Sequence, residues 1–296
     1  MAAERAVLVT GASTGIGRAV ALRLDAAGWR VYAGVRRQED ARSLQDAASA
    51  RFTPVLLDVN DDEQVREVAD RIDRETGAAG LAGLVNNAGI AVAGPLEFLP
   101  LAELRQQLDV NVLGQVAVLQ AMMPALRRAR GRILFVGSIA GRSALPFTGG
   151  YSASKFALEA IADSLRVELQ PWGLDVVVIE PGAIATPIWE TSSTRAERNM
   201  ERMPPAAIEY YGRLIGAVRA RARKSAENGL PAEVVARVVE KALTTRRPRS
   251  RYLIGRDARA RLWLERLPDR WRDAVVAAVV RRIGERESRV GSRGPG

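Results

Sequence analysis

Short runs of Val, Ile and Leu alternate with longer amphipathic stretches along the first 185 residues. Most of these runs are apolar throughout, as strands that are buried on both faces of a sheet are. This alternation predicts an α/β fold, in which a doubly wound parallel sheet is covered by helices on both faces. The expected strands are 6–10, 30–35, 53–58, 82–86, 132–137 and 174–180. The expected helices are 15–27, 39–48, 61–76, 101–129 and 151–170.

The regular alternation ends after residue 181. The stretch 186–230 is rich in charge, Ser and Thr and contains Pro204-Pro205, which predicts an irregular or mobile helical insertion. A helix at 231–244 and a short strand at 251–254 would complete the sheet. Residues 1–256 are therefore expected to form a single domain.

The C-terminal stretch has a different character. Residues 257–285 place apolar side chains among many arginines, which predicts an amphipathic helical appendage. Residues 286–296 are expected to be a disordered tail. Packing on the chain's own main domain or on a partner subunit is the favoured interpretation of the appendage. Contact with a membrane surface is the alternative.

The composition removes whole classes of chemistry. The 296 residues include neither Cys nor His, which excludes disulfides, thiolate catalysis and Ser-His-Asp hydrolysis. The usual zinc sites need the same residues, so no metal site is expected. Proton transfer near neutral pH must then use Tyr, Lys, Asp, Glu or a bound water.

The formal net charge of +10 is concentrated at one end of the chain. Residues 186–296 hold 25 of the 44 Lys and Arg but 13 of the 34 Asp and Glu. No nucleic-acid-binding module is evident in this basic region, so no nucleic acid partner is expected. The apolar run after Met1 is too short for a signal peptide or a membrane span, which leads us to expect a cytoplasmic protein.

A glycine-rich segment, Thr10-Gly-Ala-Ser-Thr-Gly-Ile-Gly17, joins the first strand to the first helix. Glycines let the chain turn sharply and bring its backbone close to a pyrophosphate, which the N-terminus of the following helix would attract. A strand–helix turn without a ligand is the alternative interpretation. The position after the first strand favours dinucleotide binding.

Val35-Arg36-Arg37 ends the second strand, where an NAD-binding site usually carries an acidic residue for the ribose hydroxyls. Two guanidiniums at this place favour the 2′-phosphate of NADP(H). Two solvated arginines at a strand end are the alternative.

Tyr151 and Lys155 lie four residues apart in a predicted helix and so share one face. A free Tyr has a pKa of about 10 and is a poor acid or base at neutral pH. A neighbouring ammonium favours the phenolate and lowers that pKa. A surface pair with no function is the alternative for these two residues taken alone.

Taken together and in order, these motifs resemble the short-chain dehydrogenase/reductase family over residues 5–255. The resemblance is carried by the Thr-Gly-x-x-x-Gly-x-Gly segment, Asn86-Asn-Ala-Gly89, Asn111, Ser138, Tyr151-x-x-x-Lys155 and Pro181-Gly182. It implies a Rossmann-type sheet and a homodimer or homotetramer. The stretch from Ala144 to Glu190 is most similar to steroid and retinol dehydrogenases.

The resemblance also implies roles for individual residues. The implied catalytic residues are Asn111, Ser138, Tyr151 and Lys155. The implied cofactor-binding residues are Gly11, Ser13, Thr14, Gly15, Ile16, Gly17, Arg36, Arg37, Asp58, Val59, Asn87, Ala88, Gly89, Tyr151, Lys155, Pro181, Gly182, Ile184 and Thr186. The expected substrate-contacting residues are Ser138, Ala140, Leu145, Phe147, Tyr151, Ile188 and Trp189. The stretch 186–230 is the expected substrate-binding insertion.

The expected function is an NADP(H)-dependent oxidoreductase that interconverts a hydrophobic secondary alcohol and a ketone or aldehyde. NAD(H) is the alternative cofactor, because Thr14 stands where many NADP-binding members carry a basic residue. The alternative functions are a catalytically silent cofactor-binding regulator and a peripheral membrane dehydrogenase of lipid-like substrates.

Overall fold

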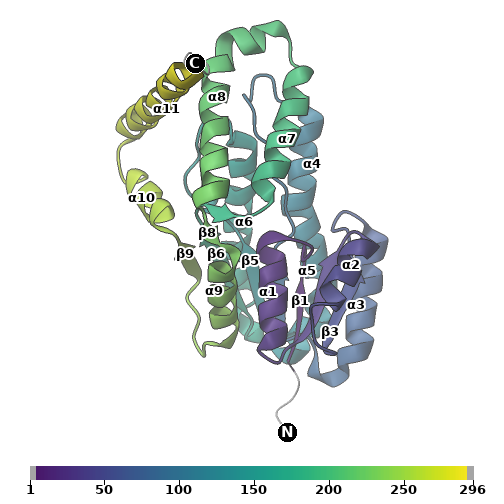
Figure 1. The fold of residues 1–296 in the computed structure, drawn as a ribbon. Helices are drawn as coiled ribbons and strands as arrows, with labels where there is room; N and C mark the ends of the chain where they lie inside the picture. The colour runs from purple at the N-terminus through teal and green to yellow at the C-terminus, as the bar shows by residue number, and fades with distance from the viewer. Residues whose placement is uncertain (1–4, 292–296) are drawn as a thin grey trace.

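The computed structural model describes residues 5–291 (Figure 1). Within this range the side chains are described except for 213, 217–219, 221, 222, 225, 226 and 283–291.

A seven-stranded sheet forms the centre of this described range, and every neighbouring pair in it is parallel. The strand order is β3-β2-β1-β4-β5-β6-β9. The strands are β1 (Ala6–Val9), β2 (Arg30–Val35), β3 (Phe52–Leu56), β4 (Gly83–Asn86), β5 (Arg132–Val136), β6 (Asp175–Pro181) and β9 (Arg251–Ile254). The predicted doubly wound parallel sheet is confirmed.

Helices cover both faces of the sheet (Figure 1). One face carries α1 (Gly15–Ala26), α2 (Gln38–Gln45) and α9 (Ala232–Thr244), and the other carries α3 (Asp62–Thr76), α5 (Gly114–Ala129) and α6 (Gly149–Glu168). Successive residues of β1 enter opposite cores, with Val7 and Val9 on the α1 side and Ala6 and Leu8 on the α3 side. Strands buried on both faces in this way need the uninterrupted apolar sequence that predicted them. Single-turn helices lie at η1 (Gly77–Ala79), η3 (Ile139–Gly141) and η4 (Gln170–Trp172).

The strand order reverses between β1 and β4. β1 is followed in sequence by β2 on one side, whereas β4 and the later strands lie on the other side. The connections that leave the carboxyl ends of β1 and β4 therefore diverge and open a crevice, which is where parallel sheets of this kind bind ligands.

The stretch predicted as one helix at 101–129 contains a π-helical turn. α4 (Leu101–Leu108) and α5 are joined by a five-residue π-helix, η2 (Asp109–Leu113), which includes Asn111. An extra residue in one helical turn re-aims the side chains that follow, and such turns are frequent at functional sites.

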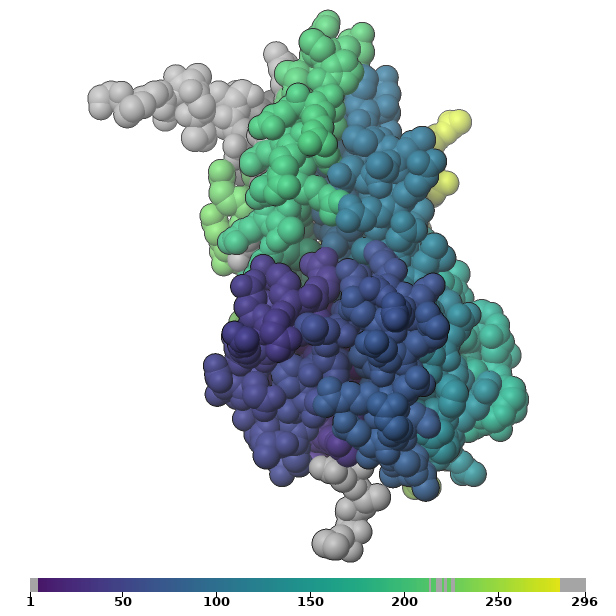
Figure 2. All heavy atoms as spheres, turned by 90° about the vertical axis from the view of Figure 1, so that its right-hand side faces the viewer, coloured from purple at the N-terminus to yellow at the C-terminus, as the bar shows by residue number. Residues whose placement is uncertain are grey.

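The stretch 186–230 is helical, as predicted, but its helices are regular, so the irregular character expected from the sequence is wrong. It forms α7 (Ile188–Glu201) and α8 (Pro205–Asn228). Pro205 occupies the first position of α8, where the missing N–H of a proline removes no helical hydrogen bond. The ends of the insertion are joined by the parallel strands β7 (Ile184–Ala185) and β8 (Leu230–Pro231). Figure 2 shows these helices, in green, standing above the purple and blue N-terminal half of the sheet domain.

The predicted C-terminal appendage consists of two helices. α10 (Arg256–Leu264) follows β9, and α11 (Asp269–Gly291) begins after Pro268 and packs on α8 (Figure 1). Because α11 continues to Gly291, the disordered tail predicted from residue 286 is wrong as far as residue 291. Residues 292–296 lie outside the described residues.

Candidate active site

The glycine-rich turn lies at the carboxyl end of β1, at the start of α1. Gly11 and Gly15 have φ angles of +63° and +56°, in the left-handed region that favours glycine. A Cβ atom at Gly17 would overlap the carbonyl oxygen of Gly11. The turn therefore depends on glycine at all three positions, and it leaves the backbone bare beside the N-terminus of α1. Ser13, Thr14 and Ile16 complete this turn and the start of the helix.

Hydrogen bonds fasten this turn to the segment that follows β4. The Thr10 hydroxyl oxygen accepts hydrogen bonds from the backbone N–H groups of Asn87 at 2.9 Å and Ala88 at 3.0 Å. The Asn87 side-chain amide donates to the carbonyl oxygens of Thr10 at 2.9 Å and Gly11 at 3.1 Å. The two segments on either side of the strand-order reversal thus form one unit.

Arg36 and Arg37 follow β2 and are exposed. Together with Ser13 and Asp40 they line a polar hollow of about 480 Å³. Arg37 forms ion pairs with Glu39 at 2.8 Å and Asp40 at 3.1 Å, whereas Arg36 makes no ion pair with another described residue. The hollow is open, carries two guanidiniums and adjoins the glycine turn, so it can accept an anionic group.

Two further predicted cofactor segments lie at the same edge of the sheet. Asp58, just after β3, accepts the N–H of Asn60 at 3.0 Å, and Val59 packs closely against Gly114. Pro181 ends β6, and Gly182 donates its N–H to Ile254 at 2.8 Å. Ile184 is buried, and Thr186 lies against Gly15. The loop after β6 therefore reaches the glycine turn.

Tyr151, Lys155 and Ser138 meet at the N-terminal part of α6. The Lys155 ammonium lies 5.8 Å from the centre of the Tyr151 ring and donates to the carbonyl oxygen of Val136 at 2.8 Å. Ser138, which follows β5, is hydrogen bonded to Tyr151. The spacing of four residues on the helix places the phenol and the ammonium on one face, as predicted from the sequence.

Burial controls the charge states at this site. It raises the pKa of Tyr151 above its ordinary value, while the hydrogen bond from Ser138 and the positive charge of Arg261 oppose the rise. Burial lowers the pKa of Lys155 to about 8, and the negative charge of Glu159 opposes this. At neutral pH Tyr151 is therefore a phenol and Lys155 remains largely protonated.

Asn111 connects α6 to the segment that follows β4. Its amide donates to the carbonyl oxygen of Ile90 at 2.9 Å and to the Ser154 hydroxyl at 3.0 Å, and its oxygen accepts the N–H of Ile90 at 2.8 Å. Ser154 in turn donates to the carbonyl oxygen of Tyr151 at 2.7 Å. A chain of hydrogen bonds thus runs from the glycine turn through Asn87–Ile90 and Asn111 to the helix that carries Tyr151.

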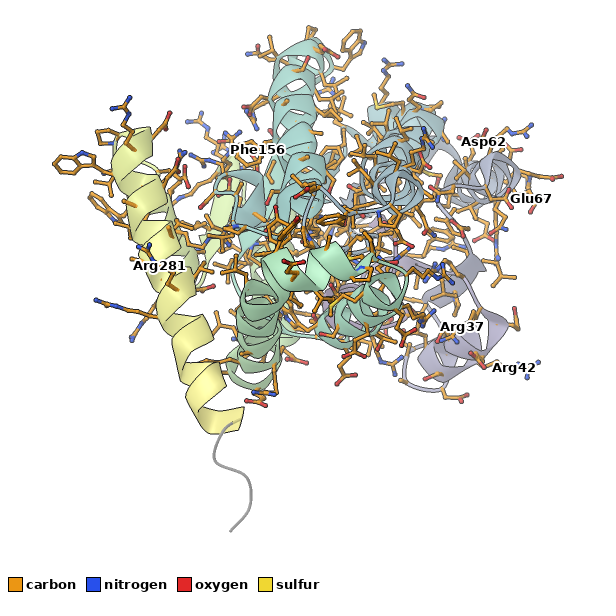
Figure 3. All side chains as sticks on the ribbon, turned by 90° about the horizontal axis from the view of Figure 1, so that it is seen from above. Arg37, Arg42, Asp62, Glu67, Phe156 and Arg281 are labelled. Carbon is orange, nitrogen blue, oxygen red and sulfur yellow. The ribbon has the colours of Figure 1, made fainter. Side chains whose placement is uncertain are left out.

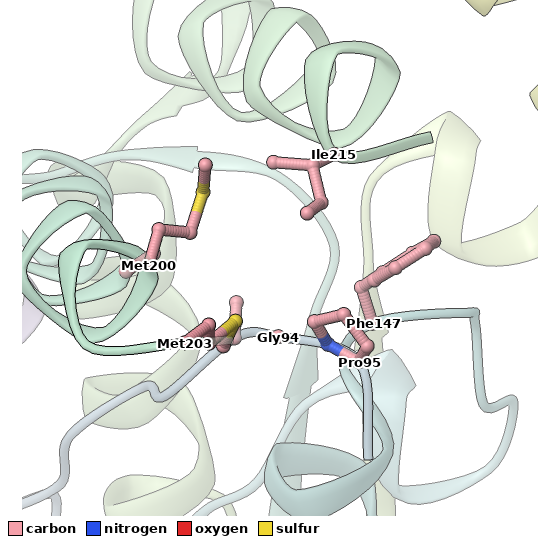
Figure 4. Close-up of a pocket in the computed structure, with 8 residues that line it drawn as sticks. Gly94, Pro95, Phe147, Met200, Met203 and Ile215 are labelled. Carbon is pink, nitrogen blue, oxygen red and sulfur yellow. The ribbon is translucent and has the colours of Figure 1, made fainter. Parts of the chain in front are cut away.

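An apolar cavity of about 40 Å³ lies beneath the α7–α8 insertion (Figure 4). Its lining comes from the loop after β4, the loop before α6 and both helices: Ala93, Gly94, Pro95, Phe147, Ala196, Met200, Met203 and Ile215. Of the expected substrate-contacting residues, Phe147 is in this lining. The other expected residues are not in it: Ser138, Ala140, Leu145, Tyr151, Ile188 and Trp189. The Trp189 indole donates instead to the carbonyl oxygen of Ile184 at 2.6 Å.

Comparison with known proteins identifies the family. The family model for short chain dehydrogenases matches residues 5–197. Retinol dehydrogenase 5 of Mus musculus is 38% identical over 289 residues, which is 95% of this chain and 90% of that protein. The NADPH-dependent 3-dehydrocapnine reductase of Ornithobacterium rhinotracheale is 34% identical over 92% of this chain and 95% of its own length. The chain belongs to the short-chain dehydrogenase family.

Solved structures agree with this assignment. A short-chain dehydrogenase from Streptomyces avermitilis matches with a TM-score of 0.73 and 27% identity over the whole of both chains. One from Burkholderia cenocepacia J2315, in complex with NADP, matches with a TM-score of 0.68 and 28% identity over 94% of this chain and 99% of that chain. The protein is therefore an oxidoreductase of the family that acts on alcohol and carbonyl groups.

In this short-chain dehydrogenase several site residues were not predicted from the sequence. Met200, Met203 and Ile215 line the cavity. Asp257 and Arg261 of α10 contact the loop after β6 and the loop before α6. The cavity residues of α7, α8 and their connection were not predicted because residues 186–230 show no clear helical period of apolar side chains. Asp257 follows Gly255, whose φ of +108° marks a forced turn, but the sequence does not show which loops that turn faces.

Proposed function

We propose that the protein is an NADP(H)-dependent enzyme that interconverts a hydrophobic secondary alcohol and a ketone or aldehyde, with Tyr151 as the general acid and base. The observation that carries the proposal is the placement of the Tyr151 phenol beside Lys155 and Ser138. These residues are linked through Asn111 to the glycine turn at the reversal of strand order.

The residues present fit a dinucleotide. The turn leaves a Cβ-free cradle at Gly11, Gly15 and Gly17, and the hollow beside Ser13 carries Arg36 and Arg37. The cradle and the start of α1 would hold the pyrophosphate. Asp58 and Val59 would hold the adenine, and Asn87–Gly89 would close over the adenosine. Pro181–Thr186 would contact the nicotinamide.

A bound nicotinamide cofactor would supply or accept the hydride. Tyr151 then carries out the proton chemistry: its phenol donates to the carbonyl oxygen in reduction, and its phenolate accepts the hydroxyl proton in oxidation. The raised pKa of Tyr151 keeps the proton-donating form populated at neutral pH. Lys155 stabilises the phenolate after that proton leaves, because its ammonium faces the ring.

Ser138 would hold the substrate oxygen beside Tyr151, because its side chain interacts with the phenol and lowers its pKa. Asn111 keeps α6 in register with the loop after β4 through its bonds to Ser154 and Ile90. We assign Ser138, Tyr151 and Lys155 to contact with the reacting groups and Asn111 to their support. The Tyr151 phenol is the proton donor that this geometry favours.

NADP(H) is the proposed cofactor because the hollow after β2 carries two guanidiniums. A doubly charged 2′-phosphate can replace the weak exposed pairs that Arg37 makes with Glu39 and Asp40. The name of the 3-dehydrocapnine reductase relative specifies NADPH dependence, and the Burkholderia structure was solved with NADP. Both support the proposal.

The apolar cavity supports a hydrophobic substrate. Its lining consists of aliphatic, aromatic and thioether side chains, and the two methionines can adapt to irregular shapes. Retinol dehydrogenases are among the relatives, which points to lipid-like alcohols as the first compounds to test.

The proposal is tested by a screen of steroids, retinoids, quinones and medium-chain ketones and alcohols, each with NADPH and with NADH. We expect turnover of apolar members, with kcat/KM for NADPH exceeding that for NADH. Turnover confined to small polar alcohols, or a preference for NADH, would contradict the substrate or the cofactor assignment respectively. Binding of NADPH without turnover of any compound would favour the silent regulator.

A second candidate function, that of a peripheral membrane dehydrogenase, is supported by exposed apolar side chains on α10 and α11. Trp263 on α10 and Trp271 on α11 are 66% and 69% exposed. Val275 and Val279 are also exposed and follow Trp271 along α11 at intervals of four residues. Arg281 projects from the same helix, on the opposite side of the molecule from Arg37 (Figure 3). None of the described helices is both long and apolar enough to cross a membrane. Co-sedimentation with anionic vesicles, with Trp263→Ser/Trp271→Ser as the comparison, tests surface binding.

The homodimer or homotetramer implied by the family resemblance stays a prediction. On α6, Phe156 and Val167 are 45% and 72% exposed (Figure 3). Light scattering of the purified protein at two concentrations checks the assembly.

A further inference from the structure

α10 reaches back to the loop that follows β6. The Asp257 carboxylate accepts the backbone N–H of Ala183 at 2.8 Å. It also fills the space beside Gly182 and Gly255, where a Cβ atom would overlap its oxygens. The Gly182 N–H donates to Ile254 at 2.8 Å, so β9 and α10 together fix the conformation of this loop.

The same helix also contacts the loop that joins β5 to α6, the helix that carries Tyr151. Arg261 is partly buried and donates from Nη2 to the carbonyl oxygen of Ser143. Ser143 is buried in the segment that runs from Ser138 to Tyr151. The neighbouring Arg142 pairs with the buried Glu180 at 3.2 Å, just before Pro181.

Asp257 and Arg261 are four residues apart, so they project from one face of α10. One contacts the loop proposed to hold the nicotinamide, and the other contacts the loop proposed to hold the substrate oxygen. A displacement of either loop by about 1 Å would cost much of the reaction rate, because hydride transfer requires close alignment of donor and acceptor.

We propose that α10 is a brace of the active site, in which Asp257 and Arg261 are positioning residues that set the distance between the loop after β6 and the loop before α6. This inference rests on the proposed function. It gives α10, which was interpreted from the sequence as part of an appendage, a role in the reaction.

The brace also has an electrostatic consequence. Lys155 from α6 and Arg261 from α10 are the described cations that face Tyr151, and Ser138 is its hydrogen-bond partner. The positive charge of Arg261 lowers the pKa of the phenol and so opposes the effect of burial. Removal of this guanidinium should raise the pKa of Tyr151 even in the protein without cofactor.

The test compares Arg261→Met and Arg261→Lys with Arg259→Met, a matched control at an exposed position of the same helix. Tyrosinate formation in the cofactor-free protein is followed by ultraviolet difference absorbance, with the signal of Tyr151→Phe subtracted to isolate Tyr151. We expect Arg261→Met to shift the Tyr151 titration to higher pH. Arg261→Lys, which keeps the charge, and Arg259→Met should leave it near the wild-type position.

Asp257→Ala and Asp257→Asn test the other contact. Asn keeps an oxygen that can accept the Ala183 N–H, whereas Ala does not. We expect Asp257→Ala to raise the Kd for NADPH by about tenfold, because the loss of one hydrogen bond costs about that much binding free energy. The Kd is measured by fluorescence without substrate. Asp257→Asn should remain within about threefold of wild type, since the bond is kept. For both Arg261→Met and Asp257→Ala we expect kcat to fall by tenfold or more.

The outcomes separate the two proposals. Activity that survives in Tyr151→Phe would overturn the proposed function, whatever the brace variants do. If Tyr151→Phe is inactive but Arg261→Met titrates like Arg259→Met, and Asp257→Ala binds NADPH as Asp257→Asn does, the brace is overturned. If Arg261→Met does not fold, Arg261→Gln takes its place, because it removes the positive charge but keeps an amide that can donate to the Ser143 carbonyl oxygen. It should also shift the Tyr151 titration to higher pH, and a titration equal to that of Arg259→Met would overturn the brace.

Discussion

Glu159 of α6 and Glu180 of β6 are bridged by one guanidinium: Arg251 is 2.9 Å from Glu159 and 3.4 Å from Glu180. Both carboxylates are buried. Burial and the neighbouring charge of Glu180 raise the pKa of Glu159 to about 7. Since Glu159 is one turn along α6 from Lys155, its ionisation changes the charge that the catalytic ammonium experiences.

A pH dependence of stability follows from this pair. The folded protein holds the Glu159 proton more tightly than the unfolded chain, whose carboxyl pKa is near 4.5. The stabilising effect of this tighter proton binding by Glu159 is therefore fully present below pH 4.5, and it is lost as the pH rises towards about 7. Glu159→Gln removes this titration, so its Tm relative to wild type should be higher at about pH 8 than at about pH 5.

The control is Glu168→Gln, an exposed carboxylate on the same helix, for which the difference in Tm should change little with pH. Equal pH slopes for Glu159→Gln and wild type in differential scanning calorimetry would contradict the raised pKa.

The hollow after β2 predicts a selective effect on the cofactor. Replacement of both Arg36 and Arg37 by Leu removes two charged donors and should raise KM for NADPH by about 10- to 100-fold, with KM for NADH changed by less than about threefold. Arg42→Leu is the matched control, because Arg42 is exposed on the same side of the molecule (Figure 3) and is not in the lining of the hollow. An unchanged ratio of the two KM values would argue against the 2′-phosphate site.

The cavity beneath α7 and α8 predicts a substrate-size effect. Ala196→Phe would fill the cavity and should lower kcat/KM for bulky apolar substrates by about tenfold or more. NADPH affinity should stay the same, because the cavity shares no residue with the hollow after β2. Thr194→Phe places the same ring on an exposed position of α7 and should have little effect. Steady-state kinetics with one large and one small ketone distinguish the two variants.

A stability prediction concerns the C-terminal end of α5. Arg130 has a φ of +48°, in the left-handed region, and is exposed. Arg130→Gly should raise the free energy of unfolding by about 1 kcal/mol, because glycine adopts this conformation without a steric cost. The same change at exposed Arg105 within α4 should lower it by about 1 kcal/mol. Urea unfolding of the two variants should show opposite signs, and a loss of stability in both would contradict the argument.

Local patterns predicted the sheet and the motifs well, because both depend on neighbours in sequence. The apolar strands, the glycine turn and the shared face of Tyr151 and Lys155 are examples. Residues that act across long separations were not found. Arg261 meets Ser143, which is 118 positions earlier, and nothing in the local sequence of either residue indicates the contact.

The π-helical turn at Asn111 and the regularity of α7 and α8 within the predicted helical insertion were missed for a different reason. A single inserted residue hardly changes the apolar period of a helix of this length. The stretch 186–230 combines charged residues and a proline pair, which conceal its helical pattern until the packing of α8 against α7 and α11 is known.

The most direct test of the account is the rate of NADPH-dependent ketone reduction by Tyr151→Phe, compared with Tyr252→Phe. The control makes the same change on β9, away from Lys155. We predict that Tyr151→Phe lowers kcat by about 10²- to 10⁴-fold, the contribution of a general acid, while NADPH binding stays near the wild-type value. Tyr252→Phe should remain close to wild type in both. A Tyr151→Phe variant that keeps wild-type kcat would contradict the central claim.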